Sequence, residues 1–323
     1  MYRKTPRLRY TTGSLTLPVT AVLAALLWLV PPLLQGIVGA PLRLLGYGLV
    51  PAALTTYALV EWNNRNALLR VRSRMVGSTY LLLIAACPAL HAFQWTLLPM
   101  LSLVPAYFAL FLTYGDRRAV GATFHAYFFL SLGSLGYTPL LALAPLLLMG
   151  QVVQLRSMSG RCLGAALLGL LLPYWLLLGY ALLAGDPMAY FLRLAEAWTF
   201  APPRPAAAPM WAVGTFGMVA LLSIVALGHY LRTAYNDKIR TRMFFYIIIM
   251  VQVVLLGACA AQPQSYEALL PLLLTNSAPL LAHHLTLARG RGSEVWFYVC
   301  ATALLALAIL NYTNLWSNWS ISW

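Results

Sequence analysis

Side chains that could act as an acid or a base are scarce in this chain, which has only 7 Asp and Glu among its 323 residues. Three of them, Asp186, Glu196 and Glu267, fall where the topology argued below predicts the outer face of a membrane. A carboxylate held beside a reacting group can serve as a general base. These three are therefore the candidate catalytic residues, although the sequence names no reaction for them.

Three arginines, Arg43, Arg193 and Arg204, are predicted on the same face. The planar guanidinium group binds phosphate through two parallel hydrogen bonds. We therefore take them as candidate phosphate-binding residues. Together with the acids, they would suit chemistry on a phosphate-bearing substrate.

A second candidate site lies within a long apolar run, where Thr275, Asn276 and Ser277 precede Pro279. Proline removes one backbone hydrogen bond, and neighbouring polar side chains can satisfy the freed group. Broken helices of this kind line substrate cavities in transporters. The same pattern is typical of a proline kink whose polar side chains bond to adjacent helices. The trio is a candidate intramembrane polar site, with packing as the alternative.

Five histidines raise the question of a metal site. His125, His229, His283 and His284 are predicted in the cytoplasmic half, and His91 near the outer edge. Their spacings form no HxxxH, HxxHH or HExxH motif. Since adjacent residues of an α-helix are about 100° apart, His283 and His284 should point to different faces. We predict hydrogen bonding for these residues, with no metal site and no cofactor.

The composition shows which elements must position these residues. Apolar side chains make up 61% of the chain and charged ones only 9%, against about 25% in soluble domains; the mean hydropathy is +0.77. This excludes a soluble globule and a disordered chain. The 4 cysteines lack CxxC spacing and are spread along the chain, so we expect packing roles rather than a disulfide scaffold.

Eleven apolar runs have the roughly 17–25 residues that a helix needs to cross a bilayer. Only a helix or a closed barrel satisfies its own backbone in lipid, and these runs lack the alternation of barrel strands. We therefore expect an all-α, polytopic, single integral membrane domain over residues 1–323. The predicted spans are 15–38, 43–61, 76–93, 95–114, 121–137, 138–155, 162–184, 210–231, 244–261, 267–288 and 295–311.

The basic residues orient these spans. With a cytoplasmic N-terminus, the inner loops hold 18 of the 21 Lys and Arg, and the outer loops keep only the three arginines named above. This is the positive-inside bias, so we predict that the C-terminus lies outside. The excess of basic residues thus indicates topology, with the lipid bilayer and not nucleic acid as partner. The preference for Arg, Leu and Ala favours the inner membrane of a bacterium.

The outer loop 185–209 is predicted to contain one further element. Asp186 and Pro187 form a typical helix start, and apolar residues then recur at helical spacing. We predict an amphipathic interfacial helix over 186–200. It would either roof a cavity that opens to lipid or serve as an anchored connector.

Several segments resemble an uncharacterised family of bacterial multi-span inner-membrane proteins. They are the hairpin FFLSLGSLGYTP at 128–139, the Pro173-Tyr174 pair, and the segments APLLAHH at 278–284 and EVW at 294–296. Some members have carried a carotene monooxygenase label. Such enzymes hold iron with histidines in a soluble propeller, which this chain cannot build, so the resemblance implies architecture only.

A more distant similarity is to GT-C-type glycosyltransferases and polyprenyl-linked glycan polymerases, which combine many helices with short inner loops and an amphipathic outer helix. That resemblance implies chemistry at the outer face on a polyprenyl-phosphate sugar. The GT-C pattern includes an acidic residue in the first outer loop, whereas residues 36–43 of this chain, GIVGAPLR, contain none. A scaffold without catalysis is therefore an alternative.

Three functions remain open at this point. The first is a role in envelope biogenesis, in which the protein handles a polyprenyl-linked glycan or lipid at the outer face. The second is a facilitative transporter or flippase that uses the broken helix near Asn276, since no ionisable group is predicted at mid-membrane. The third is a structural subunit whose partner is another membrane protein.

Overall fold

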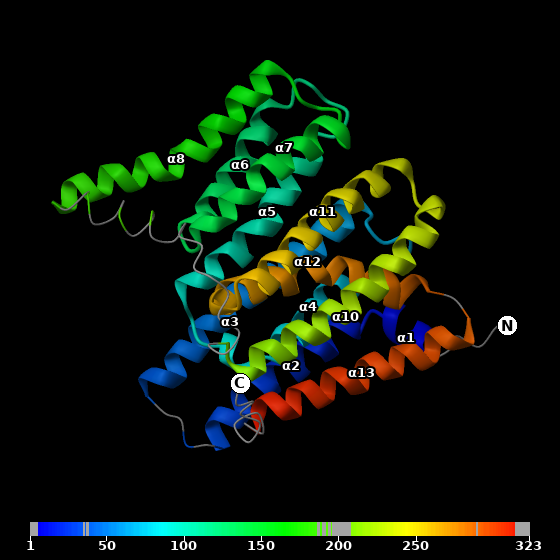
Figure 1. The fold of residues 1–323 in the computed structure, drawn as a ribbon. Helices are drawn as coiled ribbons and strands as arrows, with labels where there is room; N and C mark the ends of the chain where they lie inside the picture. Colours follow the sequence, from blue (N-terminus) through cyan, green and yellow to red (C-terminus); the bar gives the residue numbers. More distant parts are fainter. Residues whose placement is uncertain are drawn as a thin grey trace. The chain divides into compact units, whose positions relative to one another are not determined.

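The computed structural model describes residues 6–34, 36, 39–185, 188, 192, 195, 208–288 and 290–313. Every secondary-structure element in this part of the chain is helical (Figure 1), which confirms the all-α class. The chain divides into two compact units. Unit 1 comprises residues 1–93, 204–238 and 255–323, and unit 2 comprises residues 94–203 and 239–254.

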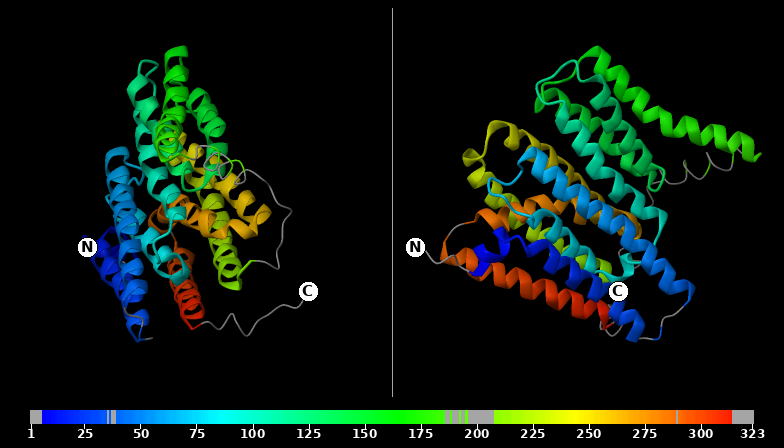
Figure 2. Two further views of the ribbon diagram at one scale, coloured as in Figure 1. Left: turned by 90° about the vertical axis from the view of Figure 1, so that its left-hand side faces the viewer. Right: turned by 180° about the vertical axis from the view of Figure 1, so that it is seen from behind.

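Unit 1 contains most of the long helices. Its α-helices, apart from the end of α11, are α1 (Pro6–Thr12), α2 (Thr16–Leu34), α3 (Ala40–Asn66), α4 (Met75–Ala85), α10 (Met210–Thr233), α12 (Tyr266–Leu287) and α13 (Arg291–Tyr312). Short 3-10 turns η1 (Pro88–Leu90), η5 (Ala234–Asn236) and η6 (Pro263–Ser265) lie between them. The beginning of α13 lies beside α1 (Figure 2, right), where the rings of Tyr10 and Phe297 are 5.9 Å apart.

Helix α12 forms the centre of unit 1. It packs against α4, α10 and α1, and most of its residues are buried, including Thr275, Asn276, Ser277 and His283, whereas Glu267 is exposed and His284 is half-buried. A helix covered on every side must satisfy its polar groups within the protein. Unit 1 therefore encloses its polar groups around α12.

Helix α4 is shorter than the predicted span 76–93, because it ends at Ala85. Pro88 has no backbone N–H and restrains the preceding Cys87 to a non-helical conformation. At its other end α4 lies close to α3, since a Cβ atom on Gly77 would approach Val60 Cγ2 to 2.6 Å. Gly77 thus permits close contact between the two helices.

Unit 2 is built around α6. Its elements are η2 (Trp95–Leu97), α5 (Leu98–Leu112), α6 (Val120–Ser134), η3 (Thr138–Ala142), α7 (Leu143–Val153), α8 (Gly160–Ala184) and the first part of α11 (Ile239–Ala261). Helix α6 packs against both α5 and α8. A Cβ on Gly133 would meet Ser102 of α5, and a Cβ on Gly169 of α8 would meet the carbonyl of Phe124. Small residues thus let these helices approach closely.

Seven described helices are long and apolar enough to cross a membrane. They are Thr16–Leu34, Leu42–Asn66, Trp95–Leu112, Gly160–Ala184, Met210–Asn236, Ile239–Ala261 and Gly292–Tyr312. Several carry large apolar side chains on their surface, such as Leu183, which is 91% exposed, and Trp175, which is 74% exposed. Apolar surface of this extent is disfavoured in water by about 25 cal/mol per Å². The fold is therefore that expected of a multi-pass membrane protein.

The count of seven differs from the eleven predicted spans. Helices α4 and α6 have 11 and 15 residues, and the apolar helix Thr138–Val153 is also short. Helix α12 has 22 residues and is long enough, but it is not among the seven helices that are apolar enough to cross a membrane. Four predicted spans thus correspond to helices that are shorter or less apolar than these seven, and their status as full spans stays a prediction. They are the spans 76–93, 121–137, 138–155 and 267–288.

Candidate functional site

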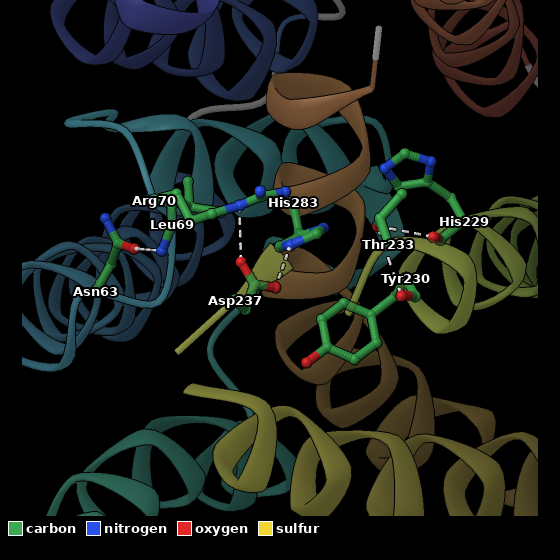
Figure 3. A network of polar contacts seen from close by, with 8 residues as sticks. All are labelled: Asn63, Leu69, Arg70, His229, Tyr230, Thr233, Asp237 and His283. Atoms are coloured by element: carbon green, nitrogen blue, oxygen red, sulfur yellow. Dashed lines mark hydrogen bonds and ion pairs between the residues drawn. The ribbon is translucent and has the colours of Figure 1, made fainter. Parts of the chain in front are cut away.

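A buried carboxylate joins three segments of unit 1 (Figure 3). The side chain of Asp237, in the turn after η5, is fully buried. One of its oxygens forms an ion pair with Nε of Arg70 at 2.7 Å. The other lies 3.1 Å from Nε2 of His283, whose side chain is also fully buried. The three residues come from the α3–α4 loop, the α10–α11 turn and α12.

Local hydrogen bonds fix the loop that carries Arg70. Asn63, near the end of α3, accepts a bond from the backbone N–H of Leu69 at 3.2 Å and donates one to the carbonyl of Ser73 at 3.0 Å. Ala67 ends the helix in the left-handed conformation, with φ of 48°. One buried amide therefore holds both ends of the loop, which positions Arg70 against Asp237.

This network places the carboxylate of Asp237 in a buried position, where an ionised group is destabilised by the loss of its hydration. Transfer of a lone carboxylate out of water costs several kcal/mol, and a paired cation offsets that cost only when the geometry is good. Here Asp237 has a guanidinium on one oxygen and an imidazole on the other. Removal of Arg70 would leave the buried carboxylate without its cation, and the contact with His283 joins this pair to α12.

Arg7 caps the C-terminus of α12. Its guanidinium donates to the carbonyls of Leu285 at 3.0 Å, of Thr286 at 3.4 Å and of Ala288, and to the hydroxyl of Ser293. The last carbonyls of a helix have no partner within the helix and carry a partial negative charge. Burial lowers the pKa of Arg7 below its ordinary value, and the negative charge of Glu294 opposes this shift. Arginine nevertheless keeps its proton in proteins.

Two further histidines lie next to this network. The rings of His229 on α10 and His284 on α12 are 4.6 Å apart in an edge-to-face arrangement, and the ring of His283 is 6.1 Å from that of His229. Among the described residues, Nε2 of His229 and both ring nitrogens of His284 are buried without a hydrogen-bond partner. The two neighbours His283 and His284 do point in different directions, as the helical spacing predicts, because only His283 bonds to Asp237.

His284 also lines an apolar cavity of about 420 Å³ within unit 1. Side chains of α1, α4, α10, α12 and α13 form its wall, which is almost entirely hydrocarbon and aromatic. Leu82, Leu222, Leu281, Leu304, Trp296 and Cys300 are among them. Small-molecule sites enclose about 300–1,000 Å³ and combine an apolar wall with a few polar groups, and this cavity has both features.

A second cavity, of about 880 Å³, is polar and lies around the loop that carries Arg70. Arg70, Arg72 and Arg74 line it together with Asn63 and other polar residues. The three arginines belong to the basic inner-loop set from which the topology is predicted. These arginines give the loop a positive potential, which favours contact with an anionic membrane surface.

The predicted polar trio of α12 is buried but engaged in packing. The hydroxyl of Thr275 donates to the carbonyl of Pro271 at 2.8 Å, and that of Ser277 donates to the carbonyl of Leu273 at 2.6 Å. Ser223 of α10 donates to Ser277 at 3.3 Å. Asn276 is 1% exposed. Neither cavity described above is lined by these residues, so the contacts favour the packing interpretation.

The predicted outer residues are described only in part. Glu267 is exposed in the first turn of α12, and Arg43 is exposed on α3; no ion pair joins these two described residues. Asp186, Arg193, Glu196 and Arg204 lie outside the described residues, as does most of the predicted interfacial helix 186–200.

The sequence analysis did not single out Arg70, Asp237 or Arg7. A signal was present for Asp237, because it is a lone acid in a turn followed by Lys238, Arg240 and Arg242. Its partners could not be inferred, since they lie 167 and 46 positions away in the sequence.

No group of three or more His, Cys, Asp or Glu side chains in the described part of the chain is arranged to hold a metal ion. No protein-family model matches the chain, and neither does any curated protein or solved structure. The cavities and the polar groups around them are therefore the features of the molecule that indicate a function.

Proposed function

We propose that this protein is a multi-pass protein of the bacterial inner membrane that binds the hydrocarbon chain of a lipid-linked compound in the apolar cavity of unit 1. In this proposal it acts in envelope biogenesis, on a polyprenyl-linked glycan or a related lipid. The N-terminus is cytoplasmic, the arginine-bearing loops face the cytoplasm and the C-terminus lies outside. The resemblance to multi-span inner-membrane proteins is consistent with this function. The GT-C-like pattern implies chemistry at the outer face, whereas Tyr10, His284 and Trp296 place the cavity near the arginine-bearing end of unit 1.

The apolar cavity is the observation that carries the proposal. Its wall is formed by five helices, two of which, α10 and α13, lie within candidate membrane spans. An isoprenoid or acyl chain in such a cavity exchanges one apolar environment for another, so its affinity comes from close packing and not from escape from water. A chain that lies in the membrane can reach the cavity without crossing water.

Selectivity for a lipid rather than for a polar solute follows from the same wall. A sugar or an amino acid in this cavity would lose its hydrogen bonds to water and gain almost none, which costs several kcal/mol. The buried trio at 275–277 lines neither of the two cavities described above. The geometry thus favours lipid handling over facilitative transport of a polar solute.

The four cysteines supply an assay for occupancy. Cys87, Cys162 and Cys259 are buried, whereas Cys300 is partly exposed and lines the cavity. A hydrophobic thiol reagent should therefore label Cys300 first in detergent-solubilised protein. We expect a saturating prenyl compound of about fifteen carbons, the length of a farnesyl chain, to slow this labelling at least fivefold.

A matched pair of variants tests the cavity itself. Ala301 lines the cavity, whereas Ala306 is exposed on the same helix outside it. Ala301→Phe should fill the cavity and abolish protection by the prenyl compound, while Ala306→Phe should leave it intact. In a Cys300→Ala background, labelling of the Ala306→Cys variant measures nonspecific shielding of thiols by the micelle. Equal protection at positions 300 and 306 would refute the proposal.

A further inference from the structure

The polar cavity of unit 1 is lined by three arginines from one short loop. Arg70, Arg72 and Arg74 follow one another at every second position between α3 and α4, and all three line the cavity. No Asp or Glu is among the described residues of its wall. The acid of α3, Glu61, is paired with Arg65 one turn further on. The loop therefore gathers three positive charges around a space whose wall has no acidic side chain.

The three arginines differ in their partners. Arg70 is paired with Asp237 at 2.7 Å, as Figure 3 shows. Arg74 donates to the backbone carbonyl of Ser14 at 3.4 Å, which is a long hydrogen bond to a neutral group. Arg72 is exposed and has no ion pair or hydrogen bond with any residue in the described ranges. Two of the three guanidinium groups therefore lack a carboxylate, and the cavity keeps an excess of positive charge.

Two other segments add neutral hydrogen-bond donors. Ser14, in the turn between α1 and α2, and Asn64, on α3, line the same cavity and are exposed. Within the part of the chain that the structure describes, neither side chain has a hydrogen-bond partner. A hydroxyl and a primary amide can both donate to an anionic oxygen. The cavity thus combines guanidinium groups from the loop with neutral donors from two other segments.

This donor set matches a phosphate group better than a carboxylate. A phosphate ester has up to two negative charges and three acceptor oxygens, whereas a carboxylate has one charge and two oxygens. The planar guanidinium group binds phosphate through two parallel hydrogen bonds. One phosphate can therefore engage Arg72 and Arg74 together. The cavity volume of about 880 Å³ also leaves room for an organic group attached to the phosphate.

We propose that the polar cavity of unit 1 is a phosphate-binding site, in which Arg72 and Arg74 bind the phosphate oxygens and two neutral side chains, Ser14 and Asn64, donate further hydrogen bonds. The phosphate belongs to a lipid head group or to a soluble compound, and the recognition is the same for both. No described residue lines both this cavity and the apolar one, so the site goes beyond the proposed function and does not depend on it. Binding makes and breaks no covalent bond.

The experiment measures thermal unfolding of the full chain in an uncharged detergent, because a ligand that binds the folded form raises the unfolding temperature. The probes are dioleoylphosphatidylglycerol and sodium phosphate. Their controls are dioleoylphosphatidylcholine, which has the same hydrocarbon chains, and sodium chloride at equal ionic strength. We expect at least one probe to raise the unfolding temperature above its control in a saturable manner. A response to the lipid alone assigns the site to a head group, and a response to sodium phosphate shows that the phosphate group suffices. No response to either probe would overturn the proposal.

Three variants with the same change in net charge locate the site. Arg72→Gln and Asn64→Asp each lower the net charge by one inside the cavity. Arg118→Gln lowers it by one at an exposed position in the α5–α6 turn, which lines neither of the cavities described above. Because Arg72 and Asn64 have no partner in the described part of the chain, their variants should unfold at the wild-type temperature without ligand.

We expect Arg72→Gln and Asn64→Asp each to raise the half-saturating concentration of the probe at least about tenfold, since a charge-assisted hydrogen bond is lost or opposed. Arg118→Gln should change this concentration less than twofold, because solvent screens a charge that lies outside the site. Arg72→Lys keeps the charge but lacks the planar fork, so its half-saturating concentration should lie between those of the wild type and Arg72→Gln. Equal effects of the three charge-matched variants would show that net charge alone attracts the phosphate, and would refute a site in the cavity.

Discussion

The two ends of unit 1 use the same residue types for different purposes. At the end where α4 terminates, His91 stacks on Trp28 with ring centroids 3.7 Å apart, and its Nε2 lies 3.2 Å from the carbonyl of Ile84. At the arginine-bearing end, His284 contacts His229 and Trp296 only through its ring faces and edges. The first histidine completes a packed junction, and the second lines a cavity.

The neighbours of each histidine explain the contrast. Near His91, α4 ends at Ala85, so its last backbone carbonyls have no partner within the helix. Side chains from α13 donate to them: Asn311 bonds to the carbonyl of Ala86 at 2.8 Å, and Tyr312 bonds to that of Ala85 at 3.0 Å. Around His284, the last carbonyls of α12 are already bound by Arg7. The imidazole of His284 is therefore not needed as a cap.

Asp237→Ala should give the largest effect and would test whether the arginine-bearing end depends on its buried charge. The change removes the ion pair with Arg70 and the contact with His283. A hydrogen bond to a charged group contributes about 1.5–3 kcal/mol, so the two together contribute about 3–5 kcal/mol. We expect a fall of this size in the free energy of unfolding, measured by denaturant titration in detergent. Asp116→Ala, at an exposed position whose carboxylate accepts from the Arg118 backbone, should cost far less. Equal losses in the two variants would show that the network does not stabilise unit 1.

Asn311→Ala should have an intermediate effect and probes the opposite end. Its amide bonds to the carbonyl of Ala86 and lies 3.4 Å from the hydroxyl of Thr215. Removal of a buried donor costs about 1–3 kcal/mol, so the unfolding midpoint should fall by a corresponding amount. Protection of Cys300 by the prenyl compound should not change once the variant is folded. A large loss of protection would contradict the division between a packing end and a binding end.

The smallest predicted effect on stability is the one that distinguishes His91 from His284. His91→Phe keeps a ring on Trp28 but loses the bond to Ile84, which should cost about 1 kcal/mol. His284→Phe removes a ring whose two buried nitrogens have no hydrogen-bond partner among the described residues, so it should not lower the free energy of unfolding. Paired unfolding measurements check the order. If His284→Phe proved the more destabilising, the comparison would be reversed.

The helical class could be predicted from the sequence because apolar runs of bilayer length leave the backbone few alternatives. The divergent directions of His283 and His284 followed from helical geometry alone. The end of α4 was missed although Pro88 marks it, since a run of apolar residues outweighed the proline in the prediction of 76–93.

The network around Asp237 could not be predicted, because its formation depends on how α12 packs against two loops far away in the sequence. Periodicity within a helix says which residues share a face but not which loop lies opposite. The outer acids attracted attention as possible bases, whereas the acid that the structure engages most closely is in an arginine-rich turn. Long-range pairing, rather than residue type, distinguishes Asp237 from Glu267.

The cap on α12 has a consequence for biosynthesis. Arg7 and its acceptor at Leu285 are separated by 278 positions. At about 5–20 residues per second, a ribosome needs between roughly 14 and 56 s to synthesise the segment between them. Throughout that interval the guanidinium of Arg7 must be solvated by water or lipid head groups, so the first segment of the chain docks only after α12 and the start of α13 have been made.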